Sequence, residues 1–337
     1  MKCYIDTVVI YMNINLPVTM IDTYSKWKFH QRKDNNDTHF FNRHRGVTFR
    51  YYPCRYGHCQ LWAAFSIPKL LRGSNLWNIT LGSLNEVYTA VGDALGEVVD
   101  INRLPTAFRS VAGWQVSRMD CFILHRIEPR LRQEYLNAYQ RLTLGSYVPY
   151  SHQNTFYLNS TLKKHRAAGT VVRIYPKIQE VGETSDTIPK DIGKDMEYYM
   201  GLCDELLDYI RIEFQFRRRT LRYFFNHRKS VTLADVLDEQ FQTDRINRMI
   251  ERLGLHRDII SRRHMRDKLD RLFSKQPTRQ RAGRYISLVN SRGASRRAIW
   301  NAFTQGQVAY IRHVLHKNHL HTVVSDYEDL EPVKLLK

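Results

Sequence analysis

Alternating apolar and polar residues along the first two thirds of the chain predict β-strands. The pattern indicates strands at residues 3–11, 46–52, 58–65, 116–124, 170–178 and 209–216. Apolar residues at helical spacing predict one helix around 87–98 and another at 195–208. Because strands and helices do not alternate strictly, we expect an α+β fold with an antiparallel or mixed β-sheet.

The pattern becomes helical and basic after Lys229. Thr232 and Asp235 have the spacing of a capping box. Ser295 is expected to begin a helix that ends at Phe303, residues 305–306 to form a turn, and a second helix to continue to about residue 317. This resembles a helix-turn-helix, although plain helical hairpins share the pattern. We therefore expect an α+β domain at 1–228 and a helical DNA-binding region at 229–337.

Composition adds a strong charge to this picture. The chain has 337 residues, of which 43% are hydrophobic, so it has enough apolar material for a packed core. Its 52 Lys and Arg outnumber its 33 Asp and Glu, which gives a net charge of +19. Ten basic residues fall within 257–284, and six fall within 217–229 without an acid. Several basic stretches with interleaved aromatic residues favour nucleic acid as the partner, whereas a single one is usually a solvated face.

Several classes of protein are disfavoured. No apolar run approaches the ~20 residues of a membrane span, so we expect no membrane partner. Residues 1–10 have the pattern of a strand and not of a signal peptide. Five scattered cysteines argue against a disulfide framework and for a reducing compartment, so we expect a cytoplasmic protein. The chain has no Walker-type phosphate loop, which argues against an ATP-driven motor.

Two carboxylates occur inside otherwise apolar strands, Asp120 in VSRMDCFIL and Glu213 in YIRIEFQF. An arginine two residues earlier, Arg118 or Arg211, is the simplest partner for each. If the strands share one sheet face, the carboxylates and His58 would offer ligands suited to Mg²⁺ or Mn²⁺. Such an ion would polarise a phosphodiester for attack by a tyrosine hydroxyl.

A second candidate metal pattern, His319-Leu-His321, lies far along the chain from the predicted strand at 170–178, which contains Tyr175. We interpret these histidines as part of a helix C-terminus.

Four segments occur in an order that resembles a known family: 66–77 (SIPKLLRGSNLW), 117–120 (SRMD), 172–177 (VRIYPK) and 210–213 (IRIE). Together they resemble the filamentous-phage gene II family of replication initiators and related phage and plasmid initiators. The similarity spans roughly residues 58–225, and the end of the chain around Arg297, Trp300 and Arg312 also resembles that family's end.

The resemblance implies a rolling-circle initiator, which nicks and rejoins one strand at a phage or plasmid origin through a 5′-phosphotyrosine. It implies Tyr175 as the nucleophile and Lys177 as a stabiliser of the charge that develops at phosphorus. Asp120 would be a ligand of Mg²⁺ or Mn²⁺, and Glu213 a second ligand or an orienting group. His58 is our choice for the third ligand, because relatives often carry an acid on that strand and this chain does not.

The resemblance also bears on alternatives and partners. The segment at Phe156-Tyr157 resembles a tyrosine segment of plasmid initiators, so Tyr157 is the reserve nucleophile. Expected partners are double- and single-stranded origin DNA in a bacterial host, with host helicase and polymerase as candidates. The basic residues expected to contact DNA are Lys163, Lys164, Arg166, Arg173, Arg217, Arg218, Arg219, Arg296, Arg297 and Arg312.

Three other functions stay open on sequence grounds. A non-catalytic DNA-binding protein such as a repressor would keep the carboxylates in ion pairs. A conjugative relaxase would use the same tyrosine chemistry, and an RNA-binding protein would share the basic and aromatic surface.

Overall fold

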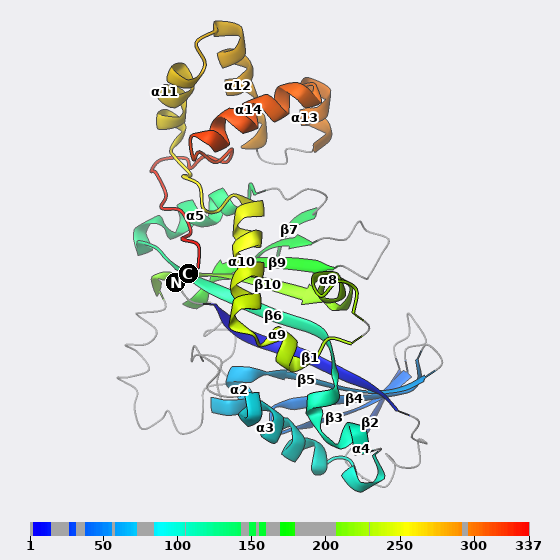
Figure 1. Cartoon of the computed structure of the whole chain (residues 1–337). Coiled ribbons are helices and arrows are strands. Elements are labelled where there is room, and N and C mark those ends of the chain that lie inside the picture. The colour runs from blue at the N-terminus through cyan, green and yellow to red at the C-terminus, as the bar shows by residue number, and fades with distance from the viewer. Residues whose placement is uncertain are drawn as a thin grey trace.

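The computed structural model describes residues 3–14, 27–31, 38–55, 58–72, 84–104, 106–142, 148–152, 155–159, 169–178, 207–228, 230–291 and 296–336. Within these ranges the protein is α+β, with ten strands in one antiparallel sheet ordered β2-β3-β4-β5-β1-β6-β10-β9-β8-β7 (Figure 1). The strands are β1 (Tyr4–Ile14), β2 (Lys28–Gln31), β3 (Thr38–His44), β4 (Val47–Arg55), β5 (His58–Ser66), β6 (Gln115–Arg126), β7 (Val148–His152), β8 (Thr155–Asn159), β9 (Thr170–Pro176) and β10 (Tyr209–Arg217).

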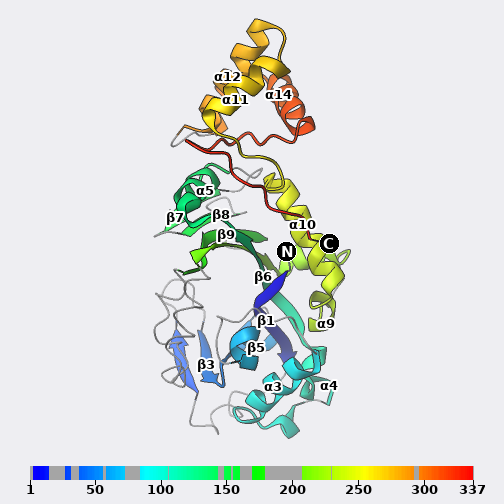
Figure 2. The same cartoon turned by 90° about the vertical axis from the view of Figure 1, so that its left-hand side faces the viewer.

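The described helices fall into two groups. Those associated with the sheet are α2 (Ile67–Arg72), α3 (Leu84–Gly96), α4 (Thr106–Arg109), α5 (Arg132–Tyr139), α8 (Arg218–Phe224), α9 (Leu233–Val236) and α10 (Glu239–Leu253). A second group, α11 (Arg262–Leu272), α12 (Gln276–Val289), α13 (Arg296–Ala302) and α14 (Gln305–Lys317), forms what we call the helical lobe, and it lies beyond the sheet in both views (Figures 1 and 2). No helix in the described ranges is long and apolar enough to span a membrane.

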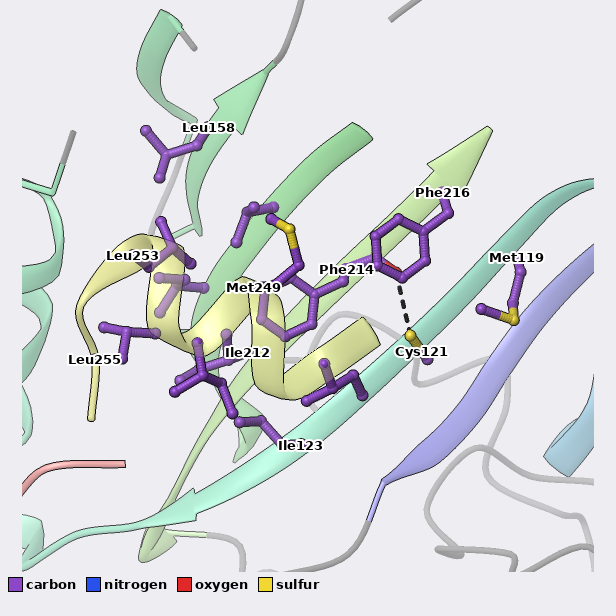
Figure 3. Close-up of a cluster of buried hydrophobic side chains, with 14 of the residues drawn as sticks. Met119, Cys121, Ile123, Leu158, Ile212, Phe214, Phe216, Met249, Leu253 and Leu255 are labelled. Carbon is purple, nitrogen blue, oxygen red and sulfur yellow. Dashed lines mark hydrogen bonds between the residues drawn. The ribbon is translucent and has the colours of Figure 1, made fainter. Parts of the chain in front are cut away.

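One side of the sheet, which we call the helix face, carries the hydrophobic core. Successive strand residues point to opposite sides, so alternate apolar residues of β6 and β10 all reach this face. They meet α10, whose apolar residues Ile246, Met249, Ile250 and Leu253 recur at helical spacing and are buried. Figure 3 labels the side chains of this cluster: Met119, Cys121, Ile123, Leu158, Ile212, Phe214, Phe216, Met249, Leu253 and Leu255.

Two connecting segments join the helical lobe to the rest of the molecule. They run side by side, because Asp258 pairs with Leu320 and Ser261 pairs with Ser325. After the lobe the chain returns to the sheet, where the Val333 amide donates to the Leu255 carbonyl at 2.8 Å. Both views also show that the two described ends of the chain lie close together (Figures 1 and 2). The lobe is an insertion between α10 and the C-terminal tail.

The structure confirms the six predicted strands and the capping box at Thr232 and Asp235. The sequence pattern missed the short strands β2, β3, β7 and β8. The expected turn at residues 305–306 is wrong, because these residues form the first turn of α14. Thr304 caps that helix instead, since its hydroxyl accepts the Gln307 amide at 3.3 Å. The helix expected at 195–208 lies almost wholly outside the described residues.

The boundary expected near residue 228 falls between α8 and α9. Both α9 and α10 follow it, yet α10 packs on the helix face of the sheet (Figure 3). Packing therefore places these two helices with the sheet, and the lobe begins only after Ser261.

Candidate active site

The side of the sheet opposite the helix face, which we call the polar face, carries the candidate site. One row of residues crosses this face, and each residue stands directly opposite the next on the neighbouring strand. The row consists of Phe122 on β6, Glu213 on β10, Arg173 on β9, Tyr157 on β8 and Tyr150 on β7. Directly opposite partners in an antiparallel sheet share a face. The register thus gathers three predicted residues, Glu213, Arg173 and Tyr157, on one side of the sheet.

Tyr175 belongs to the next row, opposite Arg211. Its hydroxyl donates a hydrogen bond to Glu213 Oε2 at 3.1 Å, so the expected nucleophile and one expected carboxylate are in contact. The Tyr175 side chain is half-buried, whereas Glu213 is 1% exposed. The carboxylate is therefore fixed in the sheet, and the phenol lies between it and the surface.

Asp120 is held on the same face by several donors. Arg118 contacts both of its oxygens, with Nε 2.8 Å from Oδ1 and Nη2 close to Oδ2. Arg173 Nη2 lies 3.2 Å from Oδ2, and Gln215 Nε2 lies 3.3 Å from it. The Asp120–Arg118 pair expected from the sequence is confirmed.

A third carboxylate, Asp6 on β1, extends this network. Its Oδ2 lies 2.5 Å from Arg211 Nη2, and its Oδ1 accepts the Ser66 hydroxyl at 2.8 Å. The same Arg211 nitrogen lies 3.1 Å from Glu213 Oε2, so the second expected ion pair is also confirmed. Arg173 Nη1 lies 3.0 Å from Glu213 Oε1. Carboxylates and guanidiniums therefore alternate across the face in the order Asp6, Arg211, Glu213, Arg173, Asp120, Arg118.

The pKa values of Glu213 and Asp6 are shifted in opposite directions. Burial raises the pKa of Glu213, and the guanidiniums of Arg211 and Arg173 offset only part of that effect. Burial acts in the same sense on Asp6, but Arg211, the Ser66 hydroxyl and Lys177 outweigh it and lower the Asp6 pKa. Glu213 is therefore a stronger base than an ordinary carboxylate and hydrogen-bonds the Tyr175 hydroxyl.

Lys177, expected to stabilise the charge that develops at phosphorus, is buried away from the surface where DNA would bind. Its side chain is fully buried, and its ammonium lies 5.9 Å from the centre of the Phe122 ring. The Arg211 guanidinium lies 3.7 Å from the same ring. In this position Lys177 supports the charge of Asp6, and its contact with a phosphate stays a prediction.

The register separates His58 from the other expected ligands. His58 is the first residue of β5, beyond the pair Cys59–Ile14, whereas Asp6 and Ser66 lie at the opposite end of the β1–β5 pair. Ser66 is eight residue steps along the strand from His58, which is about 27 Å. The structure therefore does not bring His58 to Asp120 and Glu213.

The expected DNA-contacting residues fall into three groups. Arg173 and Arg217 are half-buried on the polar face, and Arg218 and Arg219 are exposed at the start of α8. Arg312 is exposed on α14 and donates to the Tyr285 hydroxyl at 2.7 Å. Lys163, Lys164 and Arg166 lie outside the described residues, as do the side chains of Arg296 and Arg297.

Sequence reasoning missed Asp6 and Tyr150. Asp6 stands inside the apolar run YIDTVVI, the same signal that identified Asp120 and Glu213. Tyr150 carried no comparable signal, because its strand is five residues long and is recognisable only through its pairing with β8.

The expected metal site is not formed by the side chains as they stand. Across the described ranges, no three His, Cys, Asp or Glu residues are arranged to hold a metal ion. Arg173 contacts both Glu213 and Asp120, so a guanidinium stands between the two expected ligands. The predicted Mg²⁺ or Mn²⁺ does not fit this donor set without displacement of that arginine.

His321, from the second metal pattern, is also committed to structural contacts. Its Nε2 lies 2.9 Å from the Leu253 carbonyl, and its Nδ1 accepts the Val323 amide at 2.8 Å. It therefore satisfies the C-terminus of α10 and not that of its own helix.

Comparison of the chain with protein-family models, with curated proteins and with solved structures finds no match.

Proposed function

We propose that this protein is a rolling-circle replication initiator, which nicks and rejoins single-stranded DNA through Tyr175. The observation that carries the proposal is the hydrogen bond of 3.1 Å from the Tyr175 hydroxyl to the buried Glu213 carboxylate, beside Arg173. A phenol, a base and a phosphate-binding cation on one face are the minimum for phosphodiester transesterification. The family resemblance stated above points to the same chemistry.

In the proposed reaction, Tyr175 Oη forms a bond to phosphorus, and Glu213 accepts the phenolic proton. The bond between phosphorus and the 3′ oxygen breaks, and that oxygen takes up a proton to leave a free 3′ hydroxyl. The 5′ end stays joined to Tyr175. Because the phosphodiester energy is kept in phosphotyrosine, rejoining is the reverse reaction and needs no ATP.

The phosphate must be neutralised during attack, since a dianionic phosphorane develops. Arg173 contacts Glu213, lies on the same strand as Tyr175 and is half-buried, and its guanidinium offers a planar pair of donors to phosphate oxygens. Contact with phosphate would replace its present bond to Asp120. Asp120 would then keep Arg118 as its partner.

Covalent capture tests the proposal. The protein is incubated with a single-stranded library of random sequence, with Mg²⁺, with Mn²⁺ and with chelator, and SDS-resistant protein–DNA adducts are counted. We expect an adduct with the wild-type protein and none with Tyr175→Phe, while both proteins bind DNA equally. Adduct formation by Tyr175→Phe, or its absence from the wild-type protein in every condition, would refute the proposal.

One observation favours a second function, a non-catalytic DNA-binding protein. Each of the three carboxylates on the polar face is in contact with an arginine, as structural ion pairs would be. The same experiment separates the two functions, because a repressor binds DNA and forms no adduct.

A further inference from the structure

Two tyrosine rings are stacked face to face at the end of the described sheet. The ring centres of Tyr150 on β7 and Tyr157 on β8 lie 4.6 Å apart, with 4° between their planes. Tyr150 is 46% exposed, whereas Tyr157 is half-buried between Tyr150 and the Arg173 strand. β7 ends the order of strands, so the outer part of Tyr150 is accessible. This is a rigid aromatic surface and not a core contact.

Two guanidinium groups lie near this pair of tyrosines. Arg173 stands directly opposite Tyr157, and the electrostatic fields of Arg173 and Arg217 both reach the Tyr150 hydroxyl. Arg217 stands directly opposite Arg118 on β6, so these two cations are crowded together, and burial together with the Arg118 guanidinium lowers the pKa of Arg217. Anions relieve such crowding.

The charge of the whole polar-face cluster is positive. Five cations, Arg118, Arg173, Lys177, Arg211 and Arg217, accompany three carboxylates, Asp6, Asp120 and Glu213. Two positive charges are therefore in excess. An exposed aromatic ring next to excess guanidinium charge is the combination that binds single-stranded nucleic acid, because bases stack on the ring and phosphates lie on the cations.

We propose that Tyr150 is a stacking platform for one base of a single DNA strand, with the adjacent phosphates lying over Arg217 and Arg173. Duplex DNA is excluded, since its bases are stacked on one another and offer no free face to Tyr150. Tyr157 supports the platform ring from behind and is a positioning residue, not the nucleophile. The inference rests on the proposed function only in that the platform would lead the strand toward Tyr175.

The test is fluorescence anisotropy with a 5′-labelled dT 12-mer in chelator, in a Tyr175→Phe background that cannot cleave. We expect Tyr150→Ala to weaken binding about tenfold or more, the loss of one base stack. Tyr150→Phe keeps the ring and should bind within about twofold of the parent. Tyr327→Ala, at a tyrosine that is 83% exposed on the C-terminal tail, is the matched control and should leave binding unchanged.

A second probe separates stacking from charge. A 12-mer of abasic sites keeps the phosphates and lacks bases, so Tyr150→Ala should change its affinity little, whereas Arg217→Gln should weaken both probes. If Tyr150→Ala weakened binding of both probes equally, or did not weaken binding of dT, the proposal of a stacking platform would be overturned. Tighter binding of a uridine RNA 12-mer than of dT would overturn the assignment to DNA.

Photocrosslinking of the unmutated protein keeps the inference falsifiable if Tyr150→Ala does not fold. A 12-mer that carries 5-iododeoxyuridine should crosslink to Tyr150, and crosslinks confined to other residues would overturn the proposal. These binding measurements do not depend on cleavage. A protein that binds dT through Tyr150 but forms no adduct at Tyr175 would refute the initiator proposal and leave the platform standing.

Discussion

At the scale of single residues, burial decides what each charged group on the polar face can do. Glu213 and Arg211 are both 1% exposed, so neither can exchange its partner for water. Arg173 and Tyr175 are half-buried and so partly accessible, and they are the groups to which we assign contact with the phosphate. In the proposed reaction, Glu213 would therefore act on DNA only through Tyr175.

The assignment of Glu213 as the base predicts a specific loss. Glu213→Gln keeps the size of the side chain and a hydrogen-bonding oxygen but cannot take up the phenolic proton. We expect adduct formation to slow by about 10²–10⁴-fold, the usual contribution of a general base, with dT affinity unchanged. Glu251→Gln, at an exposed position of α10, is the control. An unaltered rate with Glu213→Gln would reject this role.

Two buried imidazoles predict that the fold is sensitive to acid. Burial lowers the pKa of His321 and of His125 to about 4, so the folded protein keeps both neutral. Below about 6.5 the unfolded chain binds these protons first, and stability is lost as the pH falls from 6.5 toward 4. Each imidazole should cost about 2 kcal/mol of unfolding free energy at pH 5 relative to pH 7.5.

Urea unfolding at the two pH values measures this loss. His321→Gln should remove about half of it, because glutamine can hydrogen-bond without titrating. His313→Gln, at an exposed position of α14, should leave the loss unchanged. The explanation fails if His321→Gln is as sensitive to acid as the parent protein.

At the scale of elements, the joint between α10 and the lobe depends on one glycine. Gly254 ends α10 with a φ of +74°, and a Cβ there would lie 2.6 Å from Cδ2 of His321. Both the left-handed backbone and the close approach require glycine. Gly254→Ala should therefore lower the unfolding free energy by about 1–3 kcal/mol, seen as a lower melting temperature.

Gly306→Ala is the matched control, since a Cβ at this position in the first turn of α14 meets no atom within 4 Å. It should be neutral or stabilise by up to about 1 kcal/mol. Equal destabilisation by the two substitutions would contradict the account of Gly254.

Sequence patterns predicted the central elements and missed the marginal ones for a physical reason. Strands with one apolar face and one polar face carry an alternation of residue types, as in β6 and β10, so these strands and the polar residues within them were visible. Short β7 and β8 have five residues each, too few for a period to stand out. Alternation predicted that Tyr175 and Glu213 could share one sheet face. Their contact and the ion-pair order across four strands depend on register, which one sequence does not show. For the same reason His58 was grouped with residues that lie far along the sheet.

At the scale of the whole molecule, the lobe is separable because it is inserted between two segments that pair with each other. Ser261 and Ser325 are bridge partners, so a short linker can join them without moving α10 or the tail. Residues 257–317 hold 15 Lys and Arg against three Asp, an excess of twelve positive charges. We therefore propose the lobe as a second site for DNA, distinct from the polar face.

Replacement of residues 262–324 by a short Gly-Ser linker tests this division. We expect the shortened protein to stay folded and to form the adduct with single-stranded DNA. Its affinity for duplex should fall, and the dependence of that affinity on salt should become shallower because fewer phosphates are neutralised. Duplex titrations between 50 and 200 mM salt, about the range where such contacts matter, give the slope. An unchanged slope would place duplex binding elsewhere.

The most direct test of the central claim is mass spectrometry of the peptide left on cleaved DNA. Trypsin cuts after Arg173 and Lys177, so peptide 174–177 has Tyr175 as its one tyrosine, whereas Tyr157 falls in peptide 142–163. The account predicts a nucleotide mass on peptide 174–177. A nucleotide mass on peptide 142–163 would contradict it. So would finding both peptides unmodified after the protein has been shown to bind the single-stranded DNA.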